Sequence, residues 1–207
     1  MSAPAAPPPL PRAHSITGHL RAAGLFLVLM VLVAGFGYPL VVTGIADVLD
    51  PGAAHGSLIY GSNGTLVGST LVAQNLSAPW LFWERPSPTD YNMTLGAPSP
   101  PGPSDPGLRA LLNETIRYIQ KYGLATVNVT VPFAWAAPSA SSIDPDLAPQ
   151  AVLVQVPRVA EARNLSIAVV TALVNNHIVN PWLPYVGVPY VDVLSLDLAL
   201  IDQYGPR

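Results

Sequence analysis

Apolar residues are most concentrated near the N-terminus of the chain. Ala22 to Ile45 form one uncharged, almost wholly apolar run of 24 residues. As an α-helix this run rises about 36 Å at ~1.5 Å per residue, which exceeds the ~30 Å hydrocarbon core of a bilayer. The pattern predicts a disordered tail over residues 1–20, a transmembrane helix over residues 21–46 and a domain over residues 47–207, since five prolines punctuate the tail.

The domain begins with the pattern of a β-hairpin between His55 and Gln74. Two apolar runs, Ser57–Tyr60 and Leu66–Leu71, flank a turn that contains Asn63-Gly64. Asn-Gly between apolar runs is the strongest short-range hairpin signal. An aromatic-rich loop, Trp80 to Asn92, follows the predicted hairpin.

Three later segments have the apolar spacing of helices. Asp105-Pro106 starts the first, because Asp caps a helix and Pro suits its first position, and Gly123 ends it. The second begins near Pro149 and is kinked or split at Pro157, and Ser166 caps the third. Core-facing positions are predicted at Leu108, Leu111, Leu112, Ile116 and Ile119 in the first helix and at Ile167, Val170, Leu173 and Val174 in the third.

Alternation of apolar and polar residues predicts two further strands. Val127–Val131 alternates and indicates a short strand, and Tyr190–Leu194 indicates another. The apolar phase slips after Tyr190–Leu194, so either a bulge or a change of element lies there. A hairpin, separate strands and three helices together predict an α+β domain, placed outside the membrane and attached to the single N-terminal transmembrane helix.

Composition excludes several classes of function. The chain has no cysteine, so it has neither disulfides nor thiolate metal sites. Charged residues are 10% of the chain, and acidic residues outnumber basic ones after the apolar run. A mildly negative domain does not favour nucleic acid, which binds basic surfaces.

Charges around the apolar run predict its orientation. Arg12 and Arg21 precede it, whereas Asp47 and Asp50 follow it. Because positive charge stays inside, we expect a single-pass protein of the cell membrane with a cytoplasmic N-terminus and an outside domain. The alternative is a cleaved signal peptide with a small-residue site at Ala34-Gly35, but such apolar regions are usually ~7–15 residues long.

Asparagine residues support the same orientation. Six of nine begin Asn-x-Ser/Thr, whereas the 24 Ser and Thr of 207 residues predict about one such site by chance. The excess predicts an exported glycoprotein, the alternative being that polar loop residues simply cluster. The candidate glycosylation sites are Asn63, Asn75, Asn92, Asn113, Asn128 and Asn164.

No group of residues makes a convincing active site. His55 and His177 could each act as a base, but no nucleophile motif accompanies them, so a loop or core role is favoured for both. Asp144-Pro145-Asp146 could bind a cation, although Asp before Pro is more often a turn or cap. The glycines from Gly61 to Gly68 lack the Lys-Ser/Thr of a phosphate-binding loop. We therefore predict neither catalytic nor metal-binding residues.

Two segments are candidates for contact with partner subunits. Small residues let helix backbones approach closely in lipid, which makes Gly35 and Gly37, with Pro39 beside them, a candidate helix-packing surface. The aromatic loop offers Trp83-Glu84-Arg85, because aromatic and Arg residues dominate interface energetics.

Taken in order, several segments resemble one family, the C subunit of the potassium-transporting P-type ATPase, the Kdp complex. Each is weak alone, but their common order over Tyr38 to Leu200 is specific. The matching segments are Tyr38–Gly44, His55–Ile59, Val67–Ser69 with Gln74-Asn75, Trp83–Ser87 through Asp90–Asn92, Gly102–Pro106, Ile143–Pro145, Gln155–Ala160 with Ala162-Arg163, and Val191–Leu194 with Leu196–Leu200.

The chain also departs from this family's pattern. The segment Ala136–Ser142 lacks the family's glycines, and Asp146 stands where the family has His. The family's His-Thr-Glu-Gly-Arg is reduced to His177, followed by Ile178–Trp182. Roles of the missing residues do not transfer to this chain.

The resemblance implies a non-catalytic accessory subunit of an ATP-driven potassium uptake pump. Its implied partners are a channel-like potassium-translocating subunit and the P-type ATPase catalytic subunit, together with the lipid bilayer. The family is described as raising the ATPase subunit's affinity for ATP, which makes ATP a transient ligand rather than a stably bound cofactor. ATP is cytoplasmic, so an outside domain favours either a role in assembly or a cover over the external potassium entrance. Alternatives are a membrane-anchored extracellular binding module unrelated to a pump, and an anchored surface hydrolase.

Overall fold

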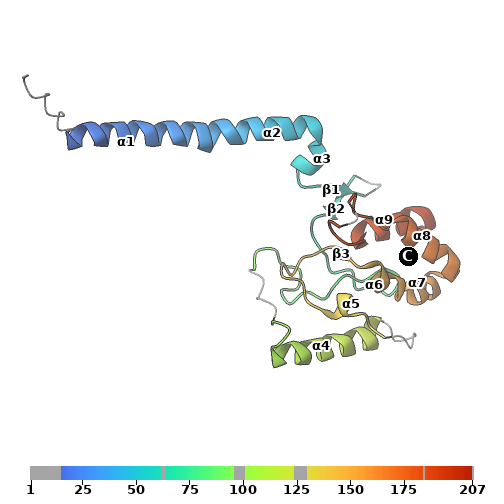
Figure 1. Cartoon of the computed structure of the whole chain (residues 1–207). Coiled ribbons are helices and arrows are strands. Elements are labelled where there is room, and N and C mark those ends of the chain that lie inside the picture. The colour runs from blue at the N-terminus through green and yellow to red at the C-terminus, as the bar shows by residue number, and fades with distance from the viewer. Residues whose placement is uncertain (1–14, 62–63, 96–100, 124–129, 184, 207) are drawn as a thin grey trace, which may run out of the picture. The chain divides into compact units, whose positions relative to one another are not determined.

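The computed structural model describes residues 15–61, 64–95, 101–123, 130–183 and 185–206 (Figure 1). The chain divides into two compact units between His55 and Gly56.

The first unit is dominated by one continuous apolar helix. It comprises α1 (Ile16–Met30), the π-helical turn η1 (Val31–Gly37) and α2 (Tyr38–Leu49). The helix from Ile16 to Leu49 is long and apolar enough to cross a membrane by length and composition. It begins within the predicted tail, because Ser15 Oγ accepts a hydrogen bond from the backbone N–H of Gly18 and caps it there.

The π-helical turn has a local cause. Pro39 has no N–H, and its ring conflicts with the carbonyl four residues earlier, which belongs to Gly35. The backbone N–H of Tyr38 instead donates to the carbonyl of Val33, five residues earlier, which is the π pattern. Gly35 and Gly37 therefore lie in a widened turn immediately before Pro39.

A short helix, α3 (Pro51–Ala54), ends the first unit. Asp50 caps it by accepting from the backbone N–H of Ala53 at 2.9 Å. His55 Nε2 lies 3.5 Å from Asp47 Oδ1, and the two side chains are 73% and 43% exposed. His55 thus lies at a helix end rather than in a catalytic constellation.

The second unit starts with the predicted hairpin. Strands β1 (Leu58–Tyr60) and β2 (Leu66–Ser69) pair antiparallel, with Tyr60 opposite Leu66. Ser69 Oγ donates to the carbonyl of Gly56 at 2.7 Å and closes the open end of the hairpin.

A second small sheet joins distant parts of the unit. Strands β3 (Asp146–Leu147) and β4 (Val191–Asp192) pair antiparallel. The predicted strand Tyr190–Leu194 is too long, because helix α9 (Val193–Tyr204) begins at Val193. Asp192 accepts from the backbone N–H of Ser195 at 2.6 Å, and this cap explains why the apolar phase changes there.

Helix α4 (Pro106–Tyr118) begins as predicted, with Asp105 Oδ1 accepting from the backbone N–H of Gly107 at 2.7 Å. It continues as η2 (Ile119–Gly123), so the helical segment ends at the predicted glycine. Most of the predicted strand Val127–Val131 lies outside the described residues. The next described element is the short helix α5 (Phe133–Ala136).

The second predicted helical region is split, as its proline requires. Helices α6 (Pro149–Leu153) and α7 (Val156–Arg163) are separated by a break, and Pro157 lies in the first turn of α7. Ser166 caps α8 (Ile167–Asn176) by accepting from Val169. The prediction that Ile167 faces the core is wrong, because this side chain is 57% exposed. Only the later residues of α8 are buried in the core, and the first turn of the helix lies outside it.

The core of the second unit lies between the loops and the C-terminal helices. Figure 1 shows α7, α8 and α9 gathered together, with α4 along another edge. Trp135 and Phe82 are fully buried, and they pack with apolar residues of α6 to α9. This mixture of small sheets and packed helices confirms the predicted α+β class.

Candidate functional site

The loop from Trp80 to Tyr91 is held by polar side chains from the C-terminal half of the chain. Gln155, between α6 and α7, is fully buried. Its Oε1 accepts from the backbone N–H of Trp83 at 2.8 Å, and its Nε2 donates to the carbonyl of Trp83 at 3.0 Å. One side-chain amide thereby satisfies both backbone groups of Trp83, as a neighbouring strand would.

Arg158 in α7 fixes the residues before the loop. Its Nη1 donates to the carbonyl of Pro79 at 2.5 Å, and its Nη2 donates to Gln155 Oε1 at 2.8 Å. The guanidinium carbon also lies 5.2 Å from the ring centroid of Trp83. Burial lowers the pKa of Arg158 to about 10, while the nearby Asp197 opposes this shift.

Two further helical side chains complete the support. Arg163, at the end of α7, donates from Nε to the carbonyl of Trp80 at 2.9 Å. Asp197 in α9 accepts from the backbone N–H of Phe82 at 2.9 Å. Asp197 is almost wholly buried, and burial raises its pKa well above the usual range. Asp197 is a charged residue flanked by apolar ones in α9, and this pattern is the sequence signal that could have identified it.

Glu84 is buried at the centre of this arrangement, with 3% of its surface exposed. Its Oε2 accepts from the backbone N–H of Gln74 at 2.7 Å, whereas Oε1 has no hydrogen-bond partner among the described residues. Burial raises the pKa of Glu84 to about 9, opposed by the Gln74 hydrogen bond and reinforced by the nearby carboxyls of Asp192, Asp197 and Asp144. Glu84 is thus protonated at neutral pH.

Arg85 and the Asp144 turn brace the other end of the loop. Arg85 Nη2 lies 3.6 Å from Asp144 Oδ2, and Tyr91 Oη donates to the carbonyl of Arg85 at 3.0 Å. Asp144 Oδ1 accepts from the backbone N–H of Asp146 at 3.1 Å, which is the turn expected for Asp before Pro. Within the described parts of the chain, no group of three or more potential metal ligands is assembled.

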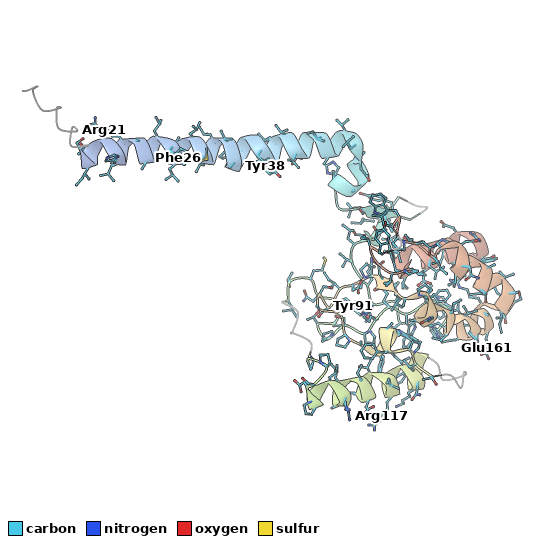
Figure 2. All side chains as sticks on the ribbon, viewed as in Figure 1. Arg21, Phe26, Tyr38, Tyr91, Arg117 and Glu161 are labelled. Atoms are coloured by element: carbon cyan, nitrogen blue, oxygen red, sulfur yellow. The ribbon has the colours of Figure 1, made fainter. Side chains whose placement is uncertain are left out.

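A cleft of about 620 Å³ opens beside this loop. Aromatic rings of Trp83, Tyr91 and Tyr118 line it, and Figure 2 shows Tyr91 among the loops, whereas Arg117 projects from α4. The lining also includes three acidic residues, Glu84, Asp90 and Glu114, and no described lining residue is basic. The cleft is therefore aromatic and acidic in character.

The structure separates the predicted contact residues into two places. Trp83 and Glu84 are buried and line the cleft, and Arg85 lies beside them with a partly exposed side chain. Gly35, Gly37 and Pro39 lie in the apolar helix of the first unit. His177, the other candidate base, has Nδ1 2.8 Å from the carbonyl of Leu173 at the end of α8.

Four of the six candidate glycosylation sites lie among the described residues. All four asparagines are exposed: Asn75, Asn92, Asn113 and Asn164. Asn164 ends α7 in the left-handed conformation, with φ +55°. Asn75 lines the cleft. Asn63 and Asn128 lie outside the described residues.

An apolar N-terminal helix followed by a small α+β domain defines the class of proteins with one candidate membrane span. Comparison with known proteins identifies the family within this class. The family model described as K+-transporting ATPase, c chain, matches residues 20–202. The chain belongs to this family, the KdpC subunits of potassium-transporting ATPases.

Individual relatives align with this chain over nearly their whole length. The potassium-transporting ATPase KdpC subunit of Geobacter sulfurreducens is 39% identical over 184 residues, covering 87% of this chain and 96% of the relative. Those of Methanosphaerula palustris and Ralstonia nicotianae are each 40% identical, covering 90% and 89% of this chain and 98% and 91% of the relatives.

Proposed function

We propose that this chain is a non-catalytic accessory subunit of an ATP-driven potassium uptake pump. It stabilises the association of the channel-like potassium-translocating subunit with the P-type ATPase subunit, and its α+β domain lies outside the membrane. Family membership supports the pump, and it disfavours the alternative of an unrelated extracellular binding module.

One observation carries the non-catalytic role. Gln155, Arg158 and Asp197, which lie in the family-like segments, all bind backbone groups of residues 79–83. Their polar atoms hold the fold, whereas catalysis requires polar groups directed at a substrate. The segments that resemble the family therefore shape a surface, which is what a binding subunit requires.

The cleft and the apolar helix are the contact surfaces that we propose. Trp83 and Glu84 form part of the cleft lining, and Arg85 braces the loop through Asp144. Trp83 is already buried within the domain, so its ring shapes the wall of the cleft against which a partner side chain would pack. A glycan on Asn75 would occupy this cleft, so glycosylation there and partner contact exclude each other.

Direct nucleotide binding by this domain is disfavoured. A triphosphate requires basic side chains or a glycine-rich loop, whereas the described lining of the cleft contains Asp90 and Glu114 and no basic residue. Any effect on ATP affinity then acts through the ATPase subunit. We expect the isolated chain neither to bind ATP stably nor to hydrolyse it.

The helix contact gives a direct test of the assembly role. We expect the double substitution Gly35→Leu and Gly37→Leu to reduce recovery of the partner subunits in mild detergent about tenfold, because two added side chains separate packed helices. Potassium-stimulated ATP hydrolysis by the purified preparation should fall in parallel. Each added Cβ meets only ordinary contacts within the helix, at 3.8 Å for Gly35 and 3.6 Å for Gly37, so the helix itself should persist.

Gly24→Leu is the matched control, since nothing lies within 4 Å of a Cβ at that position of the same helix. It should leave both recovery and hydrolysis unchanged. Full recovery of the complex with the double variant would place the contact elsewhere. Hydrolysis of ATP by the isolated chain would refute the non-catalytic role.

Orientation gives a separate prediction. Protease added to intact cells should digest the domain, because the positive charges precede the apolar helix and Asp47 and Asp50 follow it.

Mass spectrometry of protein from the native host should find glycan on exposed sites such as Asn92 and Asn113. Digestion only after lysis, with all six asparagines unmodified, would reverse the orientation.

A further inference from the structure

The acidic groups of the cleft lack basic partners within the described parts of the chain. Glu84, Asp90 and Glu114 line the cleft, and none of its described lining residues is basic. The ion pairs found among the described side chains involve neither Asp90 nor Glu114. Arg117, three residues after Glu114, is outside the lining. Because a concave surface of one charge concentrates ions of the opposite charge, the cleft favours a cation.

The aromatic rings of the cleft offer their faces rather than their polar ends. The indole N–H of Trp83 donates to the carbonyl of Ala78 at 3.0 Å, and the hydroxyl of Tyr91 donates to the carbonyl of Arg85. The ring centroid of Tyr118 lies 6.2 Å from that of Trp83, and Tyr118 is 48% exposed. An aromatic face attracts a cation, most strongly where both are partly removed from water. The rings and the carboxylates therefore select for the same charge.

The series of rings continues beyond the cleft. Tyr122 in η2 is 52% exposed, and its ring centroid lies 5.1 Å from that of Tyr118. The domain's own cations already contact rings of this series, with Lys121 Nζ 4.8 Å from the centroid of Tyr122 and the Arg158 guanidinium against Trp83. A small free cation would use the cleft alone. A protein segment that places one side chain in the cleft can also cover the exposed rings outside it.

Glu84 provides a second, independent indication of a ligand. Its side chain is buried, and Oε1 has no hydrogen-bond partner among the described residues. A buried polar atom in this state is unfavourable unless a ligand or a water molecule satisfies it. Since Glu84 lines the cleft, an entering group with several hydrogen-bonding atoms can do so.

We propose that the cleft receives a basic side chain from a partner subunit, held by the carboxylates of Asp90 and Glu114 and by the exposed ring of Tyr118. Arginine fits best, because its planar guanidinium both stacks on aromatic faces and binds carboxylates through several N–H groups. The inference rests on the subunit role proposed above, and it adds the chemistry of the contact.

The first test measures cation binding by the full chain in detergent, with fluorotyrosine in place of tyrosine and N-acetyl-arginine methylamide as the probe. The fluorine NMR signal of Tyr118, assigned by its loss in Tyr118→Phe, should shift saturably as the probe is added. N-acetyl-citrulline methylamide has nearly the same shape without the charge, and it should bind about tenfold more weakly. The double variant Asp90→Asn and Glu114→Gln should weaken binding of the arginine probe by about the same factor.

The cleft variant is expected to fold as the wild type does. Asp90 and Glu114 are both exposed, and asparagine tolerates the left-handed backbone of Asp90, where φ is +51°. Circular dichroism checks this expectation.

The second test measures recovery of the partner subunits in mild detergent. The cleft variant should recover about tenfold less of them than the wild type, because the partner's basic side chain loses both carboxylates. The double variant Glu161→Gln and Asp202→Asn is the matched control, since it removes the same two charges from exposed positions outside the cleft lining. It should recover as much as the wild type.

Equal binding of the arginine and citrulline probes would overturn the proposal. Equal recovery with the cleft variant and the control would also overturn it, while the assembly role would stand, because the glycine substitutions in the apolar helix test that role separately. In that case, binding of the arginine probe would assign the cleft to a free cation. Loss of self-association in the cleft variant would assign it to a second copy of this chain.

Discussion

Substitution of Gln155 by Ala is expected to destabilise the domain by about 3–5 kcal/mol. The change leaves the N–H and the carbonyl of Trp83 and one Arg158 nitrogen without the partner that each now has. A buried polar group left unpaired costs about 1–3 kcal/mol, and domains are stable by only about 5–15 kcal/mol. Chemical denaturation of the purified chain, followed by tryptophan emission, measures the effect.

Gln150→Ala is the matched control, because Gln150 is an exposed residue of the same type in α6. Its expected effect is within about 0.5 kcal/mol. We also expect Gln155→Ala to lower recovery of the complex, since the loop that lines the cleft loses its support. Equal stability of the two variants would show that the amide does not hold the loop.

The stability of the domain is expected to fall as pH rises from about 4.5 to about 9. Glu84 has a pKa of about 9 in the folded chain and an ordinary value in the unfolded chain, because folding buries it. Below pH 4.5 both states hold the proton. Between the two values the folded chain keeps a proton that the unfolded chain releases, so stability falls by up to about 1.4 kcal/mol per pH unit.

Asp197 acts in the same direction, since burial raises its pKa also. Asp146 contributes over a narrower range, because burial and the nearby Asp144 and Asp192 raise its pKa to about 6. The domain should therefore be most stable under acidic conditions. Thermal unfolding measured at intervals from pH 4 to pH 9 checks the direction.

The substitution Glu84→Gln separates the contribution of Glu84 to the pH dependence of stability from the contributions of other groups. Its amide oxygen can still accept from the backbone N–H of Gln74, but it has no proton to lose. We expect a higher Tm than wild type at pH 8 and a shallower dependence on pH. Glu161→Gln in α7 is the control, since Glu161 is exposed, as Figure 2 shows. A wild-type Tm that rises from pH 5 to pH 8 would contradict the prediction.

Features set by neighbouring residues could be predicted from the sequence. The uncharged run specifies the apolar helix, because length and composition alone decide whether a helix can cross a bilayer. Asp105 and Ser166 cap their helices within three residues, and Pro157 splits a helix through its own ring. The order of the family-like segments also carried the family assignment, which the comparisons confirm.

The tertiary structure decided which groups meet across the chain. The backbone N–H of Phe82 and its acceptor Asp197 are 115 residues apart, and Trp83 is 72 residues from Gln155. Burial of Glu84 and exposure of Trp182 likewise follow from packing of distant elements, although both residues are prominent in the sequence. No local pattern specifies such partners, since a polar residue in an apolar helix has the same sequence signal whether it binds a ligand or its own backbone. The sequence thus determined the elements and the family, and only the packing decided that the motif residues support a loop beside a cleft.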